Sequence, residues 1–242
     1  HLSSSVCDSI VYYVEMRAFQ RKEQKYNAYL YAVSLKDFSQ QRYVLSFPTT
    51  RQKKETLASL FWIQDLCVSS TRLVLSVQDY ILMYDRKEDQ FVYDTMLFCP
   101  NTKCLYLYND ELYYFEENHD EGYKWFYLLN NGDREFIGDL KYEAPHLVQV
   151  LPNQYLSHDE RHVYFLSTRY PVLHKYDLAG QWLEDIQFNL PCWHPFEEDY
   201  IRKSLAVPYG IERIYATQSE IFHYSYPKVV FPVGDKYLLY YT

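Results

Sequence analysis

Apolar and polar residues alternate along most of the chain in short segments, the period expected of half-buried β-strands. In five places two such segments follow one another and are succeeded by a polar turn. These places are residues 9–35, 72–85, 111–130, 162–177 and 213–225. The turns carry Asp, Asn and Gly, which tolerate the positive φ or the side-chain capping of a hairpin. The pattern therefore predicts five β-hairpins.

Further strands flank these hairpins. A third strand follows each turn, at residues 42–47, 91–98, 135–140, 182–188 and 229–233. A short apolar strand precedes three of the hairpins, at residues 66–70, 104–108 and 154–157. Anchors at Leu35, Asp85, Asn130, Asp177 and Ser225 lie 45 to 50 residues apart. Four antiparallel strands at this period are typical of the blades of a β-propeller.

We therefore expect an all-β fold, a β-propeller of four-stranded antiparallel blades, with five blades by count and six as the alternative. The expected blades are residues 6–50, 57–98, 100–141, 145–190 and 191–234 of one domain, 1–242. The first hairpin shows no preceding strand, and the last strand, 236–241, shows no blade of its own. Pairing of a closing strand, 235–242, with the N-terminal blade would hide two exposed edges.

The exception to the strand pattern is the segment 195–206. It has Pro195 at its start, three acidic residues in the first turn, Arg202 and Lys203 near the end and Pro208 beyond it, which together predict a helix. A second and weaker helix signal covers residues 51–60.

Composition adds to this description. Tyrosine, phenylalanine and tryptophan make up 19% of the chain, and most of the 28 tyrosines are expected to pack between blades. The formal charge of −8 and the scattered basic residues argue against a nucleic-acid partner. No apolar run approaches the roughly 18 residues of a membrane helix. The five cysteines are expected to be mostly buried thiols. They are Cys7, Cys67, Cys99, Cys104 and Cys192.

One repeat carries a family resemblance. The run Tyr176-Asp177-Leu178-Ala179-Gly180, preceded by the strand 162–166, resembles the repeat of TolB-like and NHL-like propellers. Among these, the secreted six-bladed propellers of Bacteroidetes are the most similar. The resemblance implies the propeller fold and an exported protein, periplasmic or on the cell surface. The first residue, His1, fits either a processed or a truncated start.

A cluster of aromatic and ionisable residues lies at 192–200, where loops of a propeller meet at the channel mouth. As a ligand-binding lip it offers a stacking ring, an imidazole and carboxylates close together. The alternative is a capped helix whose acids complement the helix dipole while Trp193 and Phe196 cover a blade. The candidate ligand-binding residues are Trp193, His194, Glu197, Asp199 and Tyr200.

Two other groups of residues resemble parts of catalytic and metal sites. Asp65 and Asp235 stand at or near the inner strands of two blades, and two carboxylates across a sugar are what glycoside cleavage requires. The run His158-Asp159-Glu160-Arg161-His162 combines imidazoles and carboxylates, but a hairpin turn exposed to solvent is favoured there.

The preferred function is a non-catalytic binding or protein-interaction propeller that recognises a glycan, a peptide or a partner protein at the channel mouth, without a cofactor or a metal. No P-loop, zinc-protease or nucleophile-elbow motif is present. The alternative is a glycoside-processing enzyme that uses Asp65 and Asp235. A third possibility is one domain of a longer chain, with part of the function elsewhere.

Overall fold

A computed structural model describes most of the chain. The described residues are 4–16, 25–48, 63–77, 79–118, 122–128, 132–141, 156–167, 170–208, 212, 224–225, 227–233 and 236–241. They divide into two compact units. The first is His1–Glu116 with Trp125–Phe136, and the second is Glu117–Lys124 with Ile137–Thr242.

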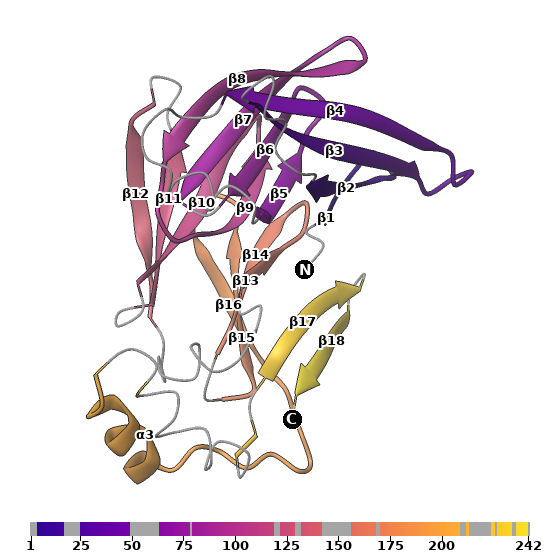
Figure 1. The fold of residues 1–242 in the computed structure, drawn as a ribbon. Coiled ribbons are helices and arrows are strands. Elements are labelled where there is room, and N and C mark those ends of the chain that lie inside the picture. The colour runs from indigo at the N-terminus through magenta and orange to yellow at the C-terminus, as the bar shows by residue number, and fades with distance from the viewer. Residues whose placement is uncertain are drawn as a thin grey trace. The chain divides into compact units, whose positions relative to one another are not determined.

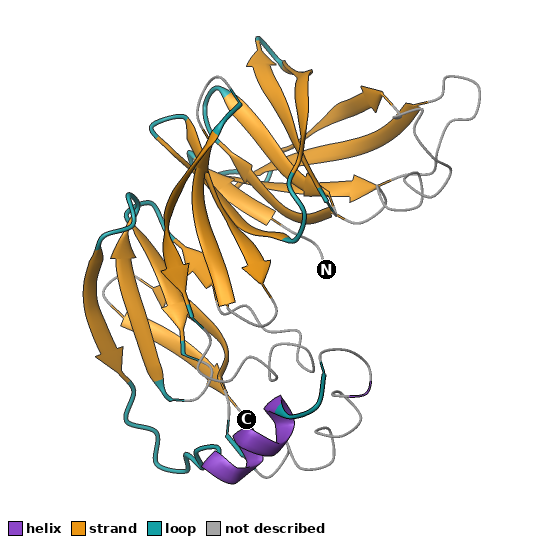
Figure 2. Ribbon diagram, turned by 90° about the vertical axis from the view of Figure 1, so that its left-hand side faces the viewer, coloured by secondary structure: helices purple, strands orange, loops and turns teal. Residues whose placement is uncertain are grey.

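Strands dominate the described structure and form four antiparallel sheets of four strands each (Figures 1 and 2). The first sheet contains β1 (Ser4–Cys7), β2 (Ile10–Met16), β3 (Lys25–Ser34) and β4 (Gln40–Pro48). The second contains β5 (Ile63–Val68), β6 (Arg72–Val77), β7 (Tyr80–Lys87) and β8 (Gln90–Phe98).

The other two sheets repeat this order. The third contains β9 (Thr102–Tyr108), β10 (Glu111–Asn118), β11 (Gly122–Leu128) and β12 (Arg134–Leu140). The fourth contains β13 (Leu156–His158), β14 (His162–Leu166), β15 (Val172–Asp177) and β16 (Trp182–Gln187). In each sheet the strands are hydrogen-bonded in chain order. The fold is thus an all-β propeller with four-stranded antiparallel blades.

In the first unit the blades stack face to face. The first strands of adjacent blades are neighbours, β1 beside β5 and β5 beside β9, and the outer strands β4 and β8 also contact each other. Two apolar clusters fill the spaces between the sheets. One surrounds Leu30, Leu73 and Tyr84, and the other surrounds Val74, Leu105 and Tyr114. The nearly continuous apolar runs of β6 and β7 therefore place apolar side chains on both faces of the second blade.

The second unit contains the fourth blade, helix α3 (Glu198–Leu205) and a two-stranded sheet of β17 (Pro227–Val233) and β18 (Lys236–Tyr241). Tyr237 of β18 contacts the Tyr164 ring of β14, with ring centroids 5.6 Å apart. The Tyr164 hydroxyl in turn donates a 2.7 Å hydrogen bond to the Asp159 carboxylate. The hairpin is thereby fixed against the fourth blade.

The blade count of five, and the alternative of six, are wrong for the described residues, which form four blades. Within the predicted fifth blade, 191–234, they form an irregular segment, α3 and β17 instead of a four-stranded sheet. The helix predicted at 195–206 is confirmed as α3, whose acidic start and basic end favour a helix. Most of the hairpin predicted at 213–225 lies outside the described residues, as does the weaker helix at 51–60.

Two details of the predicted blades also differ from the structure. The first blade does have an inner strand, β1, which pairs with β2 from Ser4 opposite Tyr13 to Cys7 opposite Ile10. The closing strand 235–242 corresponds to β18, whose described partner is β17. Its pairing with the N-terminal blade therefore stays a prediction.

Candidate functional site

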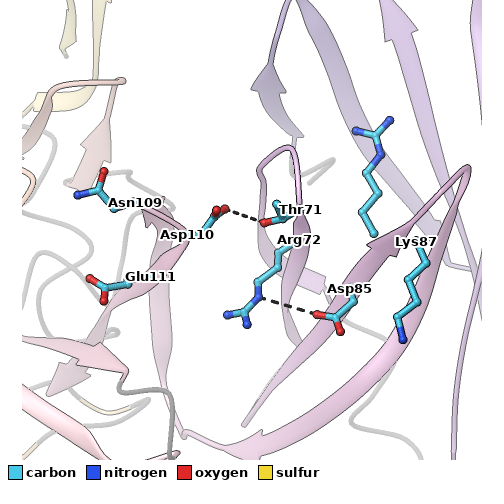
Figure 3. Close-up of a pocket in the computed structure, with 8 residues that line it drawn as sticks. Thr71, Arg72, Asp85, Lys87, Asn109, Asp110 and Glu111 are labelled. Carbon is cyan, nitrogen blue, oxygen red and sulfur yellow. Dashed lines mark hydrogen bonds and ion pairs between the residues drawn. The ribbon is translucent and has the colours of Figure 1, made fainter.

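A polar pocket of about 460 Å³ lies in the first unit, between turns of the second and third blades (Figure 3). The β5–β6 turn contributes Thr71 and the start of β6, and the β7–β8 turn contributes the end of β7. The β9–β10 turn completes the wall. The lining residues are Thr71, Arg72, Asp85, Arg86, Lys87, Asn109, Asp110 and Glu111. Six of these eight side chains are charged, three of each sign.

Different local chemistry builds the two turns that face each other across the pocket. In the second blade the Ser69 hydroxyl accepts hydrogen bonds from the backbone amides of Thr71 and Arg72, which closes a side-chain-capped turn. In the third blade Asn109 and Asp110 both have positive φ, at 53° and 62°. This is the two-residue hairpin geometry that Asn and Asp tolerate better than most residues.

Asp110 links the two turns. Its Oδ1 accepts a 2.9 Å hydrogen bond from the Ser69 hydroxyl and a 2.7 Å hydrogen bond from the Thr71 hydroxyl. These two hydrogen bonds, together with the positive charge of Arg72, hold the pKa of Asp110 below its ordinary value. Asp110 is therefore a carboxylate near neutral pH and is occupied by hydroxyl donors of the neighbouring blade.

Two more charged residues of the lining have partners within the protein. The Tyr127 hydroxyl donates a hydrogen bond to the Glu111 carboxylate, which is the main reason that the pKa of Tyr127 rises to about 12. The Arg86 guanidinium lies 5.8 Å from the centroid of the Phe91 ring and donates a hydrogen bond to the Tyr12 hydroxyl. Glu111 and Arg86 thus contribute to the blade structure.

The remaining cations are less engaged. Figure 3 shows the Arg72 side chain directed toward Asp85, and the Arg72 Nε to Asp85 Oδ1 distance is 3.9 Å. That separation exceeds the roughly 2.7–2.9 Å of a charge-assisted hydrogen bond. Lys87 is exposed and forms no ion pair with any described residue. Arg72 and Lys87 therefore bring hydrogen-bond donors to the pocket that a ligand could use.

Asp65, a predicted catalytic residue, joins two inner strands. Its Oδ2 accepts a 2.7 Å hydrogen bond from the Leu105 amide of β9, and its Oδ1 accepts a 2.8 Å hydrogen bond from the Leu66 amide. Burial raises the pKa of Asp65 to about 6, against the lowering effect of the two amides and of Lys103. Because Oδ2 binds an amide of β9 while Asp65 itself is on β5, Asp65 links the second and third blades.

Strand irregularities position this link. The β9–β10 register shifts so that Cys104 and Leu105 together face the single residue Tyr114. Cys104 has a positive φ of 46° at this bulge. A bulge leaves an extra residue outside the regular ladder, and the Leu105 amide meets the Asp65 carboxylate instead. The β5–β6 register also shifts beside Asp65.

The ligand-binding lip predicted at 192–200 lies in the second unit. His194, Glu197 and Asp199 are exposed, Trp193 is half-buried, and Tyr200 is buried at 4% exposure. The buried rings of Phe196 and Tyr200 stack at 5.5 Å. Ligand binding by the four accessible residues stays a prediction.

Hydrogen bonds and ring contacts also hold this segment in place. The Ser225 hydroxyl accepts a 3.1 Å hydrogen bond from the His194 amide, and the Ser225 amide donates a 2.8 Å hydrogen bond to the His194 carbonyl. Tyr224 contacts both Phe196 and Tyr200, at 4.8 and 4.9 Å between ring centroids. The aromatic side of α3 is therefore a packing surface.

The other predicted groups have simpler outcomes. Asp235 lies outside the described residues, so its separation from Asp65 stays untested. Asp159 caps the β13–β14 turn, because its Oδ1 accepts hydrogen bonds from the Arg161 and His162 amides. Burial would raise the pKa of Asp159, but these bonds and that from Tyr164 lower it. The hairpin interpretation of 158–162 is confirmed.

Two kinds of feature are absent from the described residues. No group of three or more His, Cys, Asp or Glu side chains there is arranged to hold a metal ion. None of the helices in the described part is both long enough and apolar enough to cross a membrane. Of the cysteines, Cys67 and Cys99 are buried, while Cys192 is exposed.

The similarity to known proteins extends to fold alone. No family model matches the chain, and no curated protein matches it in sequence. Similar solved structures include Kluyveromyces lactis Hsv2, with 10% identity, a TM-score of 0.42 and 78% of this chain covered. Citrobacter koseri AztD has 10% identity, a TM-score of 0.40 and 78% of this chain covered.

The β-propeller domain of the Trilobed protease from Pyrococcus furiosus has 12% identity and a TM-score of 0.39, over 77% of this chain and 70% of its own. The matched part spans 63% of the Hsv2 chain and 47% of the AztD chain. Similarity this low adds nothing to a functional argument. The fold assignment therefore rests on the four sheets described above.

Proposed function

We propose that the chain is a non-catalytic binding propeller whose ligand site is the pocket between the second and third blades. The observation that carries this proposal is the pocket itself, an opening of about 460 Å³ lined by charged side chains from three turns. Its walls belong to hairpins that are braced by Asp110 and by side-chain-capped turns. Sites built on braced elements bind with little ordering of the protein.

The chemistry of the lining favours binding over catalysis. It contains no histidine and no cysteine, and two of its three carboxylates, Asp110 and Glu111, already accept hydrogen bonds from hydroxyl groups. Asp65, the carboxylate of the glycoside-processing alternative, binds two backbone amides. What the pocket offers a ligand is a set of hydrogen-bond donors and acceptors on a stable frame.

A binding screen tests the proposal. The wild-type chain is applied to arrays of glycans and capped peptides, and each ligand that binds is tested again with Arg72→Gln and with Trp193→Ala. We expect ligands whose binding weakens with Arg72→Gln and persists with Trp193→Ala, since Trp193 is in the other unit. Binding lost only with Trp193→Ala would place the site at the 192–200 segment and overturn the assignment to the pocket.

A further inference from the structure

We infer that the pocket recognises a peptide segment through one carboxylate side chain, which Arg72 and Lys87 bind together. This inference rests on the proposed function and adds the chemical class of the ligand. It follows from sorting the charged groups of the lining into those that hydrogen bonds within the protein already hold and those that have at most a long ion pair.

The anionic side of the pocket is largely occupied. Asp110 Oδ1 accepts from two hydroxyls of the second blade, at 2.7 and 2.9 Å. Glu111 accepts from the Tyr127 hydroxyl. A cationic ligand would have to share these oxygens with existing donors or bind Asp85, which already faces Arg72 at 3.9 Å. The arrangement therefore does not favour an ammonium or guanidinium group as the main ligand.

The cationic side is available. The planar guanidinium of Arg72 has five N–H donors and is 3.9 Å from its nearest acidic partner, Asp85. Lys87 has three donors, is exposed, and is on the same strand as Asp85. Figure 3 shows Arg72 on one side of Asp85 and Lys87 on the other, and both residues line the pocket. A carboxylate can accept from the guanidinium in bidentate fashion while the ammonium binds one of its oxygens.

Two acceptors distinguish a peptide carboxylate from a more highly charged anion. Asp85 and the amide oxygen of Asn109 also line the pocket and are suited to accept backbone N–H groups. The lining is formally neutral, with three cations and three carboxylates, so it does not offer the net positive charge that suits a phosphate dianion, and repulsion from Asp85 is greater for a dianion than for a single carboxylate. A single carboxylate flanked by amide N–H groups satisfies both the donors and the acceptors.

The experiment uses an array of capped octapeptides. Each set of peptides has its own sequence, and many such sets are tested. Within a set the central residue is Glu, Asp, Gln, Lys or phosphoserine, and everything else is the same. We expect Glu or Asp members to bind roughly 10- to 100-fold more tightly than the Gln member, the range for losing charge-assisted hydrogen bonds. Binding should weaken as salt rises, because the pocket is open to solvent.

Three variants locate the interaction. Arg72→Gln and Lys87→Gln should each reduce binding of the Glu member toward that of the Gln member, whereas Arg72→Lys should restore it only in part, since the bidentate geometry is lost. Lys36→Gln is the matched control, because Lys36 is exposed in the corresponding turn of the first blade. Because Lys87 is exposed, its variant tests the inference even if Arg72 variants unfold.

Several results would overturn the inference. These are preference for the Lys member, preference for the phosphoserine member, equal binding of Glu and Gln members, or equal losses in Lys36→Gln and Lys87→Gln. The absence of any peptide that binds would also do so. If no peptide binds but a glycan binds the wild type and not Arg72→Gln, the proposed function stands and this inference fails.

Discussion

The Asp65 carboxylate makes the stability of the chain depend on pH in an unusual direction. Its oxygens bind the Leu66 and Leu105 amides, yet burial raises its pKa to about 6. A raised pKa means that the folded chain binds the proton more tightly than the unfolded chain does. This group therefore favours folding most at low pH, and its contribution declines as pH rises through the window from about 4 to about 6.

The magnitude follows from the two pKa values. The ordinary value is 3.8 and the folded value about 6. At ~1.4 kcal/mol per pH unit the full effect of this shift is about 3 kcal/mol, of which about 2 kcal/mol is lost from the free energy of unfolding between pH 4 and pH 7. Asp65→Asn has no proton to lose, so the variant should lack this decline. Its amide group accepts from only one of the two backbone amides, which costs about 1–3 kcal/mol.

Two measurements check this pH dependence. In urea unfolding at a series of pH values from 4 to 8, the free energy of unfolding of the wild type should fall by about 2 kcal/mol relative to that of Asp65→Asn between pH 4 and pH 8. The Leu105 amide resonance should titrate with an apparent pKa near 6. Asp94→Asn, which removes an exposed carboxylate of β8, is the control and should parallel the wild type. Parallel curves for Asp65→Asn, within about 1 kcal/mol, would refute the role of Asp65.

Three further substitutions test the packing and the turns by urea unfolding. Trp125→Phe removes the buried 3.0 Å hydrogen bond from Trp125 Nε1 to the Tyr106 hydroxyl and should lower the free energy of unfolding by about 1–3 kcal/mol, whereas a smaller change would mean that the bond contributes little. Leu73→Ala opens a cavity at a fully buried position and should lower the free energy of unfolding by about 2–5 kcal/mol. A change under about 1 kcal/mol would contradict the apolar cluster between the first two blades. Gly132→Ala should lower the free energy of unfolding by about 1–2 kcal/mol, because φ at this position is +87°. Gly138→Ala is the control: an added Cβ has open space at both glycines, so this variant should be neutral or slightly stabilising. Equal effects of the two substitutions would argue against the positive φ of Gly132.

The strand pattern predicts most of the fold for a physical reason. Blades are buried on both faces, so nearly continuous runs of aliphatic, β-branched and aromatic residues mark their most buried strands, as in 72–77 and 162–166. Strand β1 leaves no such mark, because its four residues, two of them serine, are too few and too polar to show a period. The segment 198–205 carries a clear helix signal. The count of five blades rests on anchor spacing and does not take this signal into account.

The sites could be predicted only in part. The turn residues at 69–72 and 109–110 are recognisable as turns, and neighbouring blades bring the same turns together. This repetition could have located the pocket, although it could not have shown that Asp110 bridges the two turns. The role of Asp65 depends on a bulge at Cys104 and Leu105, whose register has no marker in the sequence. The helix at α3 was recognisable from the sequence, and the burial of Phe196 and Tyr200 shows that this part of the segment packs inside the protein.

The most direct test of the central claim is to map a ligand onto the chain by backbone amide chemical shifts in isotope-labelled protein. With a Glu-containing peptide selected from the array, the account predicts that the largest shift changes fall on residues 69–72, 85–87 and 109–111 and that they disappear in Lys87→Gln. Changes concentrated on residues 192–200 instead, or along the inner strands β5 and β9, would contradict it.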